Sequence, residues 1–112
     1  MSAEHPRLCL LPLRQALPWR WELAQLELAC REAWRTPEPQ IWSARANQLG
    51  LAMAKDHGSV ALAFEGYTVV GAMWCQDGGT DDAHVFGPYC LPQYARAGLE
   101  SRLRALLVAL QQ

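Results

Sequence analysis

The stretch that decides the fold reads SVALAFEGYTVVGAMWC and covers residues Ser59 to Cys75. Its first part, Ser59–Phe64, is a short apolar run, and its second part, Tyr67–Cys75, is rich in the valine, tyrosine, threonine and tryptophan that favour strands. Glu65 and Gly66 stand between them as a two-residue turn, although glutamate tolerates the positive φ of such a turn poorly. The stretch therefore predicts a β-hairpin.

One strand and two helices are predicted on the N-terminal side of this hairpin. The strand is Leu8–Arg14, an apolar run that contains a proline. The first helix begins at Pro18, and the second extends from about Gln40 to Lys55, where Gly58 would supply a left-handed stop. On the first helix, four charged residues interleave with the apolar stripe and are expected to face solvent, namely Glu22, Glu27, Arg31 and Glu32.

A third strand and a last helix are predicted on the C-terminal side. The strand is Ala83–Tyr89, and Gly87-Pro88 within it indicates a bulge or an unpaired edge. The helix begins near Leu99 and carries a leucine stripe. The predicted order is thus β-α-α-β-β-β-α, which makes an α+β fold with a three- or four-stranded, mainly antiparallel sheet and helices packed on its faces.

The composition is that of an ordinary globular domain. The chain has 112 residues, 51% of them hydrophobic, and a formal net charge of -1. This charge gives no electrostatic basis for binding nucleic acid or an anionic membrane. No apolar run approaches the ~18–20 residues of a membrane span, and the N-terminus has no signal-peptide features. We therefore expect one cytoplasmic domain over residues 1–112.

The four cysteines predict neither a metal site nor a disulfide. None of them lies in C-x-x-C spacing or has a histidine at a zinc-like interval. If the hairpin pairs Cys75 with Ala83, then Cys90 comes opposite about Thr68, which disfavours a Cys75–Cys90 bridge. We therefore expect four free, buried thiols.

A strand–loop–helix corner follows the third strand. Residues Tyr89–Leu103 read YCLPQYARAGLESRL, which is typical of a strand end, a short loop with one glycine and the start of an amphipathic helix. Such a corner presents free backbone N–H groups and the positive end of a helix dipole, and both features suit a phosphate group. The corner is therefore a candidate anion site.

Three motifs in this order resemble the N-terminal portion of the GNAT superfamily of N-acetyltransferases. Residues Leu10–Arg14 are similar to the first strand of that family, and Phe64–Ala72 is similar to its Gly-x-hydrophobic-Val-Gly hairpin. The segment Cys90–Leu99 with the leucine helix is similar to its acetyl-CoA segment. The resemblance implies a partial GNAT-like domain that binds acetyl-CoA and acts on a small amine or a peptide.

The resemblance also implies roles for particular residues. Backbone amides at the strand end would hold the pantetheine arm, and the loop with the helix start would hold the pyrophosphate. His84 would lie where the family places a general base, although a surface or locally bonded histidine is the simpler alternative. The implied cofactor-binding residues are Tyr89, Cys90, Leu91, Arg96, Ala97, Gly98, Leu99 and Ser101.

Three departures from the family pattern leave a second function open. The family loop begins with arginine or glutamine and ends with a small residue, whereas this chain has Ala95 and Glu100 there. The Glu100 carboxylate would compete with a phosphate for the same N–H groups. The family fold also continues past this point into a segment that holds a tyrosine general acid. The alternative is therefore an inactive, acetyltransferase-like module that acts through a protein partner.

The predicted partner surface is the outer edge of the strand Ala83–Tyr89. Since nothing in the sequence is predicted to pair with it, we expect a homodimer or a complex with another protein along this edge. Trp21 and Trp34 fall off the apolar stripe of the first helix, where partial burial and a partner surface are equally open interpretations.

Overall fold

A four-stranded antiparallel sheet forms the centre of the computed structural model, which describes residues 6–55, 57–77 and 84–109. The strands are β1 (Arg7–Pro12), β2 (His57–Glu65), β3 (Thr68–Asp77) and β4 (His84–Cys90), and they lie side by side in chain order. The α+β class and the antiparallel sheet are therefore confirmed.

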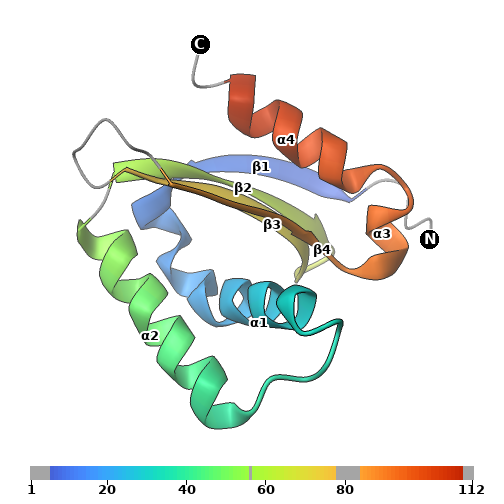
Figure 1. Cartoon of the computed structure of the whole chain (residues 1–112). Coiled ribbons are helices and arrows are strands. Elements are labelled where there is room, and N and C mark those ends of the chain that lie inside the picture. Colours follow the sequence, from blue (N-terminus) through green and yellow to red (C-terminus); the bar gives the residue numbers. More distant parts are fainter. Residues whose placement is uncertain (1–5, 56, 78–83, 110–112) are drawn as a thin grey trace.

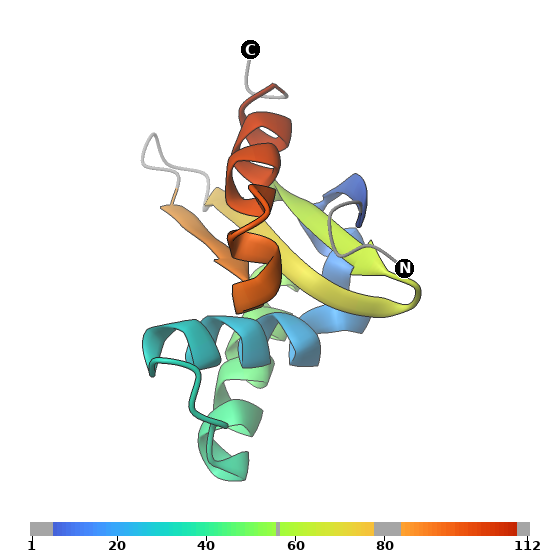
Figure 2. The same ribbon diagram turned by 90° about the vertical axis from the view of Figure 1, so that its right-hand side faces the viewer.

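Helices cover both faces of this sheet (Figure 1). A 3₁₀ helix, η1 (Leu13–Trp19), leads into α1 (Arg20–Arg31), and α1 and α2 (Pro39–Lys55) lie on one face. The single turn α3 (Pro92–Ala95) leads to α4 (Leu99–Ala109) on the opposite face, as the turned view shows (Figure 2). The sequence did not predict η1 or α3. No helix in the described ranges is long and apolar enough to cross a membrane.

The central strands are buried on both faces. In β2, Val60, Leu62 and Phe64 join the core beneath α1 and α2, while Ala61 and Ala63 join the core beneath α4. This alternation follows from the two-residue period of a strand, and it explains why the run is apolar throughout. The small residues on the α4 side allow the helix to approach the sheet closely.

The turn of the hairpin is one residue later than predicted. Glu65 is the last residue of β2 and pairs with Thr68, so the two turn residues are Gly66 and Tyr67. Gly66 has a φ of 64°. The shift gives glycine the left-handed position that glutamate would adopt only at a steric cost.

The prediction that Gly58 ends the second helix was wrong. Helix α2 ends at Lys55, and Gly58 is the second residue of β2, with a φ of 149°. A Cβ atom at this position would collide with the carbonyl oxygen of Cys75 on β3. Glycine is therefore required here by the close approach of two strands.

Strand β4 carries the predicted bulge. Trp74 pairs with Phe86 and Ala72 pairs with Tyr89, so Gly87 and Pro88 together oppose one β3 residue. The register also differs from the expected one: Cys75 lies opposite Val85, and beyond the bulge Cys90 lies opposite Gly71. Ala83, the expected partner of Cys75, lies outside the described residues. Neither of these two cysteines forms a disulfide.

Candidate functional site

The strand–loop–helix corner brings several of the predicted cofactor-binding residues together. The Leu91 N–H donates to the Val70 carbonyl at 3.0 Å, which extends the β3–β4 ladder one residue beyond Cys90. The chain then forms the turn α3 and enters α4 at Leu99. Tyr89, Cys90 and Leu91 therefore lead directly through this turn into the first residues of α4.

Three of the loop amides are used inside the corner. The N–H groups of Arg96, Ala97 and Gly98 donate to the carbonyls of Pro92, Tyr94 and Ala95 at 3.1–3.2 Å. The amides of Leu99, Glu100 and Ser101, in contrast, belong to the first turn of α4, where an α-helix supplies no internal acceptor. The first turn of α4 is therefore where this corner offers N–H groups to an anion.

Glu100 lies in that same turn and is half-buried. Burial is the main cause that raises the pKa of the Cys90 thiol to about 12, and the nearby charge of Glu100 raises it further. The same carboxylate, together with burial, raises the pKa of Cys30 on α1. Glu100 therefore places negative charge at the strand end, and Cys90 is a protonated thiol at neutral pH, not a nucleophile.

His84 lies away from the corner. It is the first residue of β4, it is exposed, and it pairs with Gln76 of β3. Cys90 is six positions further along the strand, and at the usual strand rise these six steps span about 20 Å. The fold therefore does not bring the predicted base next to the first turn of α4.

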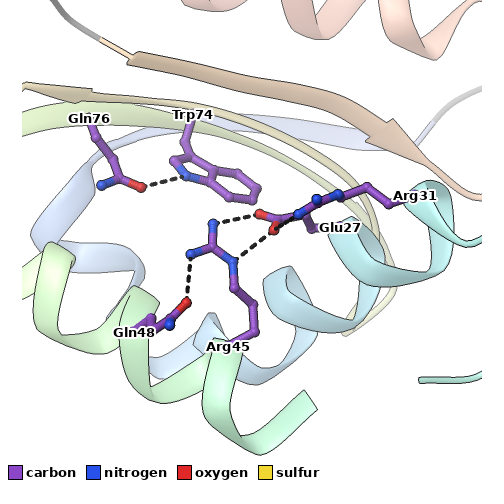
Figure 3. Close-up of polar contacts among 6 residues, drawn as sticks. All are labelled: Glu27, Arg31, Arg45, Gln48, Trp74 and Gln76. Atoms are coloured by element: carbon purple, nitrogen blue, oxygen red, sulfur yellow. Dashed lines mark hydrogen bonds and ion pairs between the residues drawn. The ribbon is translucent and has the colours of Figure 1, made fainter. Parts of the chain in front are cut away.

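A buried ion pair beneath β3 and β4 was missed by the sequence analysis (Figure 3). Glu27 of α1 is only 1% exposed, so its prediction as a solvent-facing residue was wrong. Arg45 of α2 donates from Nε and Nη2 to the two carboxylate oxygens, each at 2.7 Å. Arg31 adds a more exposed contact at 3.6 Å. A two-pronged arginine contact of this kind satisfies a buried carboxylate well.

Aromatic rings of β3 and of the edge strand β4 cover this ion pair. Trp74 stacks on Phe86 with ring centroids 5.5 Å apart, and Tyr89 also lies 5.5 Å from Trp74. The Arg45 guanidinium lies 5.7 Å from the centre of the Phe86 ring. Burial, followed by the charge of Glu27, raises the pKa of Tyr89. The half-buried Tyr89 side chain thus packs against the core beneath α1 and α2, which leaves its backbone for the role predicted from the resemblance.

One sequence signal was available for this pair. Arg45 is the lone charged residue between Gln40 and Ala54, in a helix that otherwise presents apolar and neutral polar side chains. A single arginine in such a helix favours a specific partner, because buried charges are almost always paired. Its partner lies 18 positions earlier, and no local periodicity connects the two residues.

A cavity of about 460 Å³ lies beside α1 and reaches the corner at Leu91. We call it the α1 cavity. Its walls are one side of α1, the segment that follows α1, the β2–β3 turn with the first residues of β3, and the residue after β4. The lining residues are Glu22, Gln25, Leu26, Ala29, Trp34, Arg35, Thr36, Pro37, Tyr67, Thr68, Val69 and Leu91.

The two tryptophans that fell off the stripe of α1 have different surroundings. Trp21 is half-buried, its carbonyl accepts a 2.7 Å hydrogen bond from Trp42 Nε1, and the two rings pack edge to face. Trp34 is 38% exposed and lines the α1 cavity. Partial burial therefore describes Trp21, while Trp34 belongs to an accessible surface.

Comparisons with known proteins give no match of significance to a family model, a curated protein or a solved structure. Within residues 6–55, 57–77 and 84–109, no three His, Cys, Asp or Glu side chains gather in a way that could hold a metal ion. The corner, the edge strand β4 and the α1 cavity are therefore the features of the molecule that bear on its function.

Proposed function

We propose that this chain is a GNAT-like protein that binds acetyl-CoA at the corner Tyr89–Ser101, with weak or absent N-acetyltransferase activity. The observation that carries the proposal is a bulged edge strand that ends, through one short turn, at the N-terminus of an 11-residue helix. The sequence resemblance supplies the ligand class, and the backbone at this corner is compatible with it.

Different residues of the corner are proposed to bind different parts of acetyl-CoA. The backbone at Tyr89 and Cys90 would hold the pantetheine arm, because the Leu91 N–H donates to the Val70 carbonyl and the Leu91 carbonyl accepts from Tyr94 and Ala95. The α4 amides from Leu99 to Ser101 would hold the pyrophosphate. Gly98 has a φ of 87° and open space where a Cβ would point, so the chain leaves room beside the helix start. The exposed guanidinium of Arg96 adds a cation at the same turn.

Acetyl transfer requires further groups of the protein in addition to a binding site for acetyl-CoA. When bound, acetyl-CoA supplies an activated thioester, and the protein must hold an amine next to it and take a proton from that amine. His84 is the proposed base, but it stands at the far end of β4 from the corner. Binding with weak or no transfer is therefore the activity that this arrangement favours.

Binding is tested by titrating acetyl-CoA while the thermal stability of the protein is measured. At a hundred times the dissociation constant, we expect the free energy of unfolding to rise by about 2.7 kcal/mol. The Glu100→Gln variant should bind acetyl-CoA several-fold more tightly than the unsubstituted chain, because a carboxylate no longer occupies the first turn of α4. Glu32→Gln changes the net charge equally at the end of α1 and serves as the matched control.

The outcomes of this titration separate the parts of the proposal. No shift of the unfolding temperature at millimolar acetyl-CoA would rule out the acetyl-CoA site. A shift that is the same for the Glu100→Gln and Glu32→Gln variants would leave the site but contradict the role of Glu100.

The second candidate function is a protein-interaction module that acts through β4. In the described residues, β3 is the strand that pairs with β4, and no strand lies along its other edge. The Cys90 carbonyl at the end of β4 accepts a hydrogen bond from Cys30 Sγ at 3.8 Å, so the open part of this edge is the part before Cys90. Val85 on this strand is 53% exposed, and His84 beside it is also exposed. An open edge with an exposed valine favours strand pairing with a second copy or another protein.

Light scattering at tens of micromolar tests the homodimer form of this candidate. We expect twice the mass of a single chain, and Val85→Lys should return the protein to a monomer because a charge on an edge strand opposes pairing. Val108→Lys on α4, where the valine is 45% exposed, should leave the dimer intact. A monomeric unsubstituted chain at this concentration would eliminate the homodimer.

A further inference from the structure

The lining of the α1 cavity includes charges of opposite sign, one near each end of α1. Glu22 lies in the first turn of α1, and Arg35 lies four residues beyond the last residue of that helix. Glu22, Gln25, Leu26 and Ala29 share one side of α1, because residues three and four apart are neighbours on a helix. Seven residues of helix rise make this side about 10 Å long.

The floor of the cavity is apolar and its rim is polar. Leu26, Ala29 and Val69 are buried at 5%, 7% and 7% exposure, and they form the floor together with the half-buried Leu91. Exposed amide and hydroxyl groups stand at the rim, from Gln25, Thr36 and Thr68. Such a lining suits a ligand with apolar side groups and a polar backbone.

The segment after α1 is held in an uncommon conformation that closes one end of the cavity. Ala33 and Trp34 have φ angles of 55° and 67°, a region that costs a non-glycine residue energy. The Trp34 N–H donates to the Ala29 carbonyl, and the Arg35 N–H donates to the Glu32 carbonyl at 3.2 Å. These bonds turn the chain back, so that Trp34 and Arg35 line the cavity.

We propose that the α1 cavity binds a short peptide of two or three residues with apolar side chains and two free ends. The ammonium group would pair with Glu22 and the carboxylate with Arg35, while Trp34 and Tyr67 flank the peptide. Three extended residues span about 10 Å, which matches the length of the α1 side. The volume of about 460 Å³ lies within the range of small-ligand sites.

This inference is independent of the proposed function, because the peptide site needs no acetyl-CoA. Isothermal titration of the full chain with the tripeptide Leu-Ala-Leu therefore tests it without that cofactor. The N-acetylated and C-amidated forms of the same peptide each remove one charge. We expect each form to bind about three- to tenfold more weakly than the free peptide, because each loses one charge-assisted contact.

Two variants test which residue of the cavity binds each end of the peptide. Glu22→Gln should weaken binding of the free peptide by a similar factor, and N-acetylation of the peptide should then cause no further loss of affinity. In the Arg35→Gln variant, C-amidation of the peptide should cause no further loss. Both side chains are exposed, so neither substitution should unfold the protein. The controls are Glu32→Gln and Arg104→Gln, which lie outside the cavity lining and should bind as the unsubstituted chain does.

Three outcomes would overturn the proposal. The first is no measurable heat at millimolar free peptide, and the second is equal binding of the free, acetylated and amidated peptides. The third is that Glu32→Gln or Arg104→Gln weakens binding as much as Glu22→Gln or Arg35→Gln. A loss of acetyl-CoA binding in the separate titration would leave this result unchanged.

Discussion

Replacement of Arg45 by methionine should lower the free energy of unfolding by about 3–5 kcal/mol. The substitution keeps the apolar stem but removes both 2.7 Å bonds to Glu27, whose side chain is almost fully buried. When a buried carboxylate loses its partner, its desolvation free energy is no longer offset and destabilises the folded state. Urea denaturation, followed by far-ultraviolet circular dichroism, measures this change.

Arg31→Met is the matched control for this prediction. Arg31 approaches the same carboxylate at 3.6 Å, but its side chain is 67% exposed, so its loss should cost less than about 1 kcal/mol. The double variant Glu27→Leu with Arg45→Met removes both charges and should be more stable than Arg45→Met alone. If the Arg31 and Arg45 variants lost equal stability, the Glu27–Arg45 pair would not be the contact that fastens α1 to α2.

Gly58→Ala should also be strongly destabilising, by at least about 3 kcal/mol. Two causes act together at this position, a φ of 149° and a Cβ that would collide with the Cys75 carbonyl oxygen. The collision is with the backbone of a central strand, which has little freedom to move. Because the clash separates β2 from β3, we expect the cooperative unfolding transition to move to lower urea concentration.

Gly66→Ala separates the effect of the backbone angle from that of the collision. Gly66 also has a positive φ, 64°, but a Cβ there would meet no atom within 4 Å. We expect a cost of about 1 kcal/mol, which is the ordinary penalty for a non-glycine residue in this region. Equal losses for the two alanine variants would contradict the collision between β2 and β3.

The β-hairpin was predictable because its signal is local. An apolar run, strand-favouring residues and a glycine turn all lie within Ser59–Cys75, and they predict two adjacent strands without further information. The error of one residue at the turn arose from placing Glu65 inside it. The error at Gly58 arose because a glycine after a helix has the same local pattern whether it ends that helix or opens a strand.

The candidate site was predictable to a smaller extent. The corner at Tyr89–Leu103 follows from a strand end, a glycine and a leucine helix, and the structure has a strand end and a helix start there. The hydrogen bonds that occupy the amides of Arg96, Ala97 and Gly98 do not follow from the sequence. These hydrogen bonds depend on how tightly the turn α3 is wound, and the local sequence pattern does not determine this winding.

The sequence alone determined the fold class, the strand pairing order along the hairpin and the helix that follows the corner, since each depends on residues a few positions apart. The tertiary structure decided which charges are buried and where a cavity forms. Glu27 meets Arg45 across 18 residues, and Leu91 reaches the α1 cavity beside Leu26. These contacts arise from the packing of whole helices on the sheet, and local periodicity carries no information about such distant neighbours.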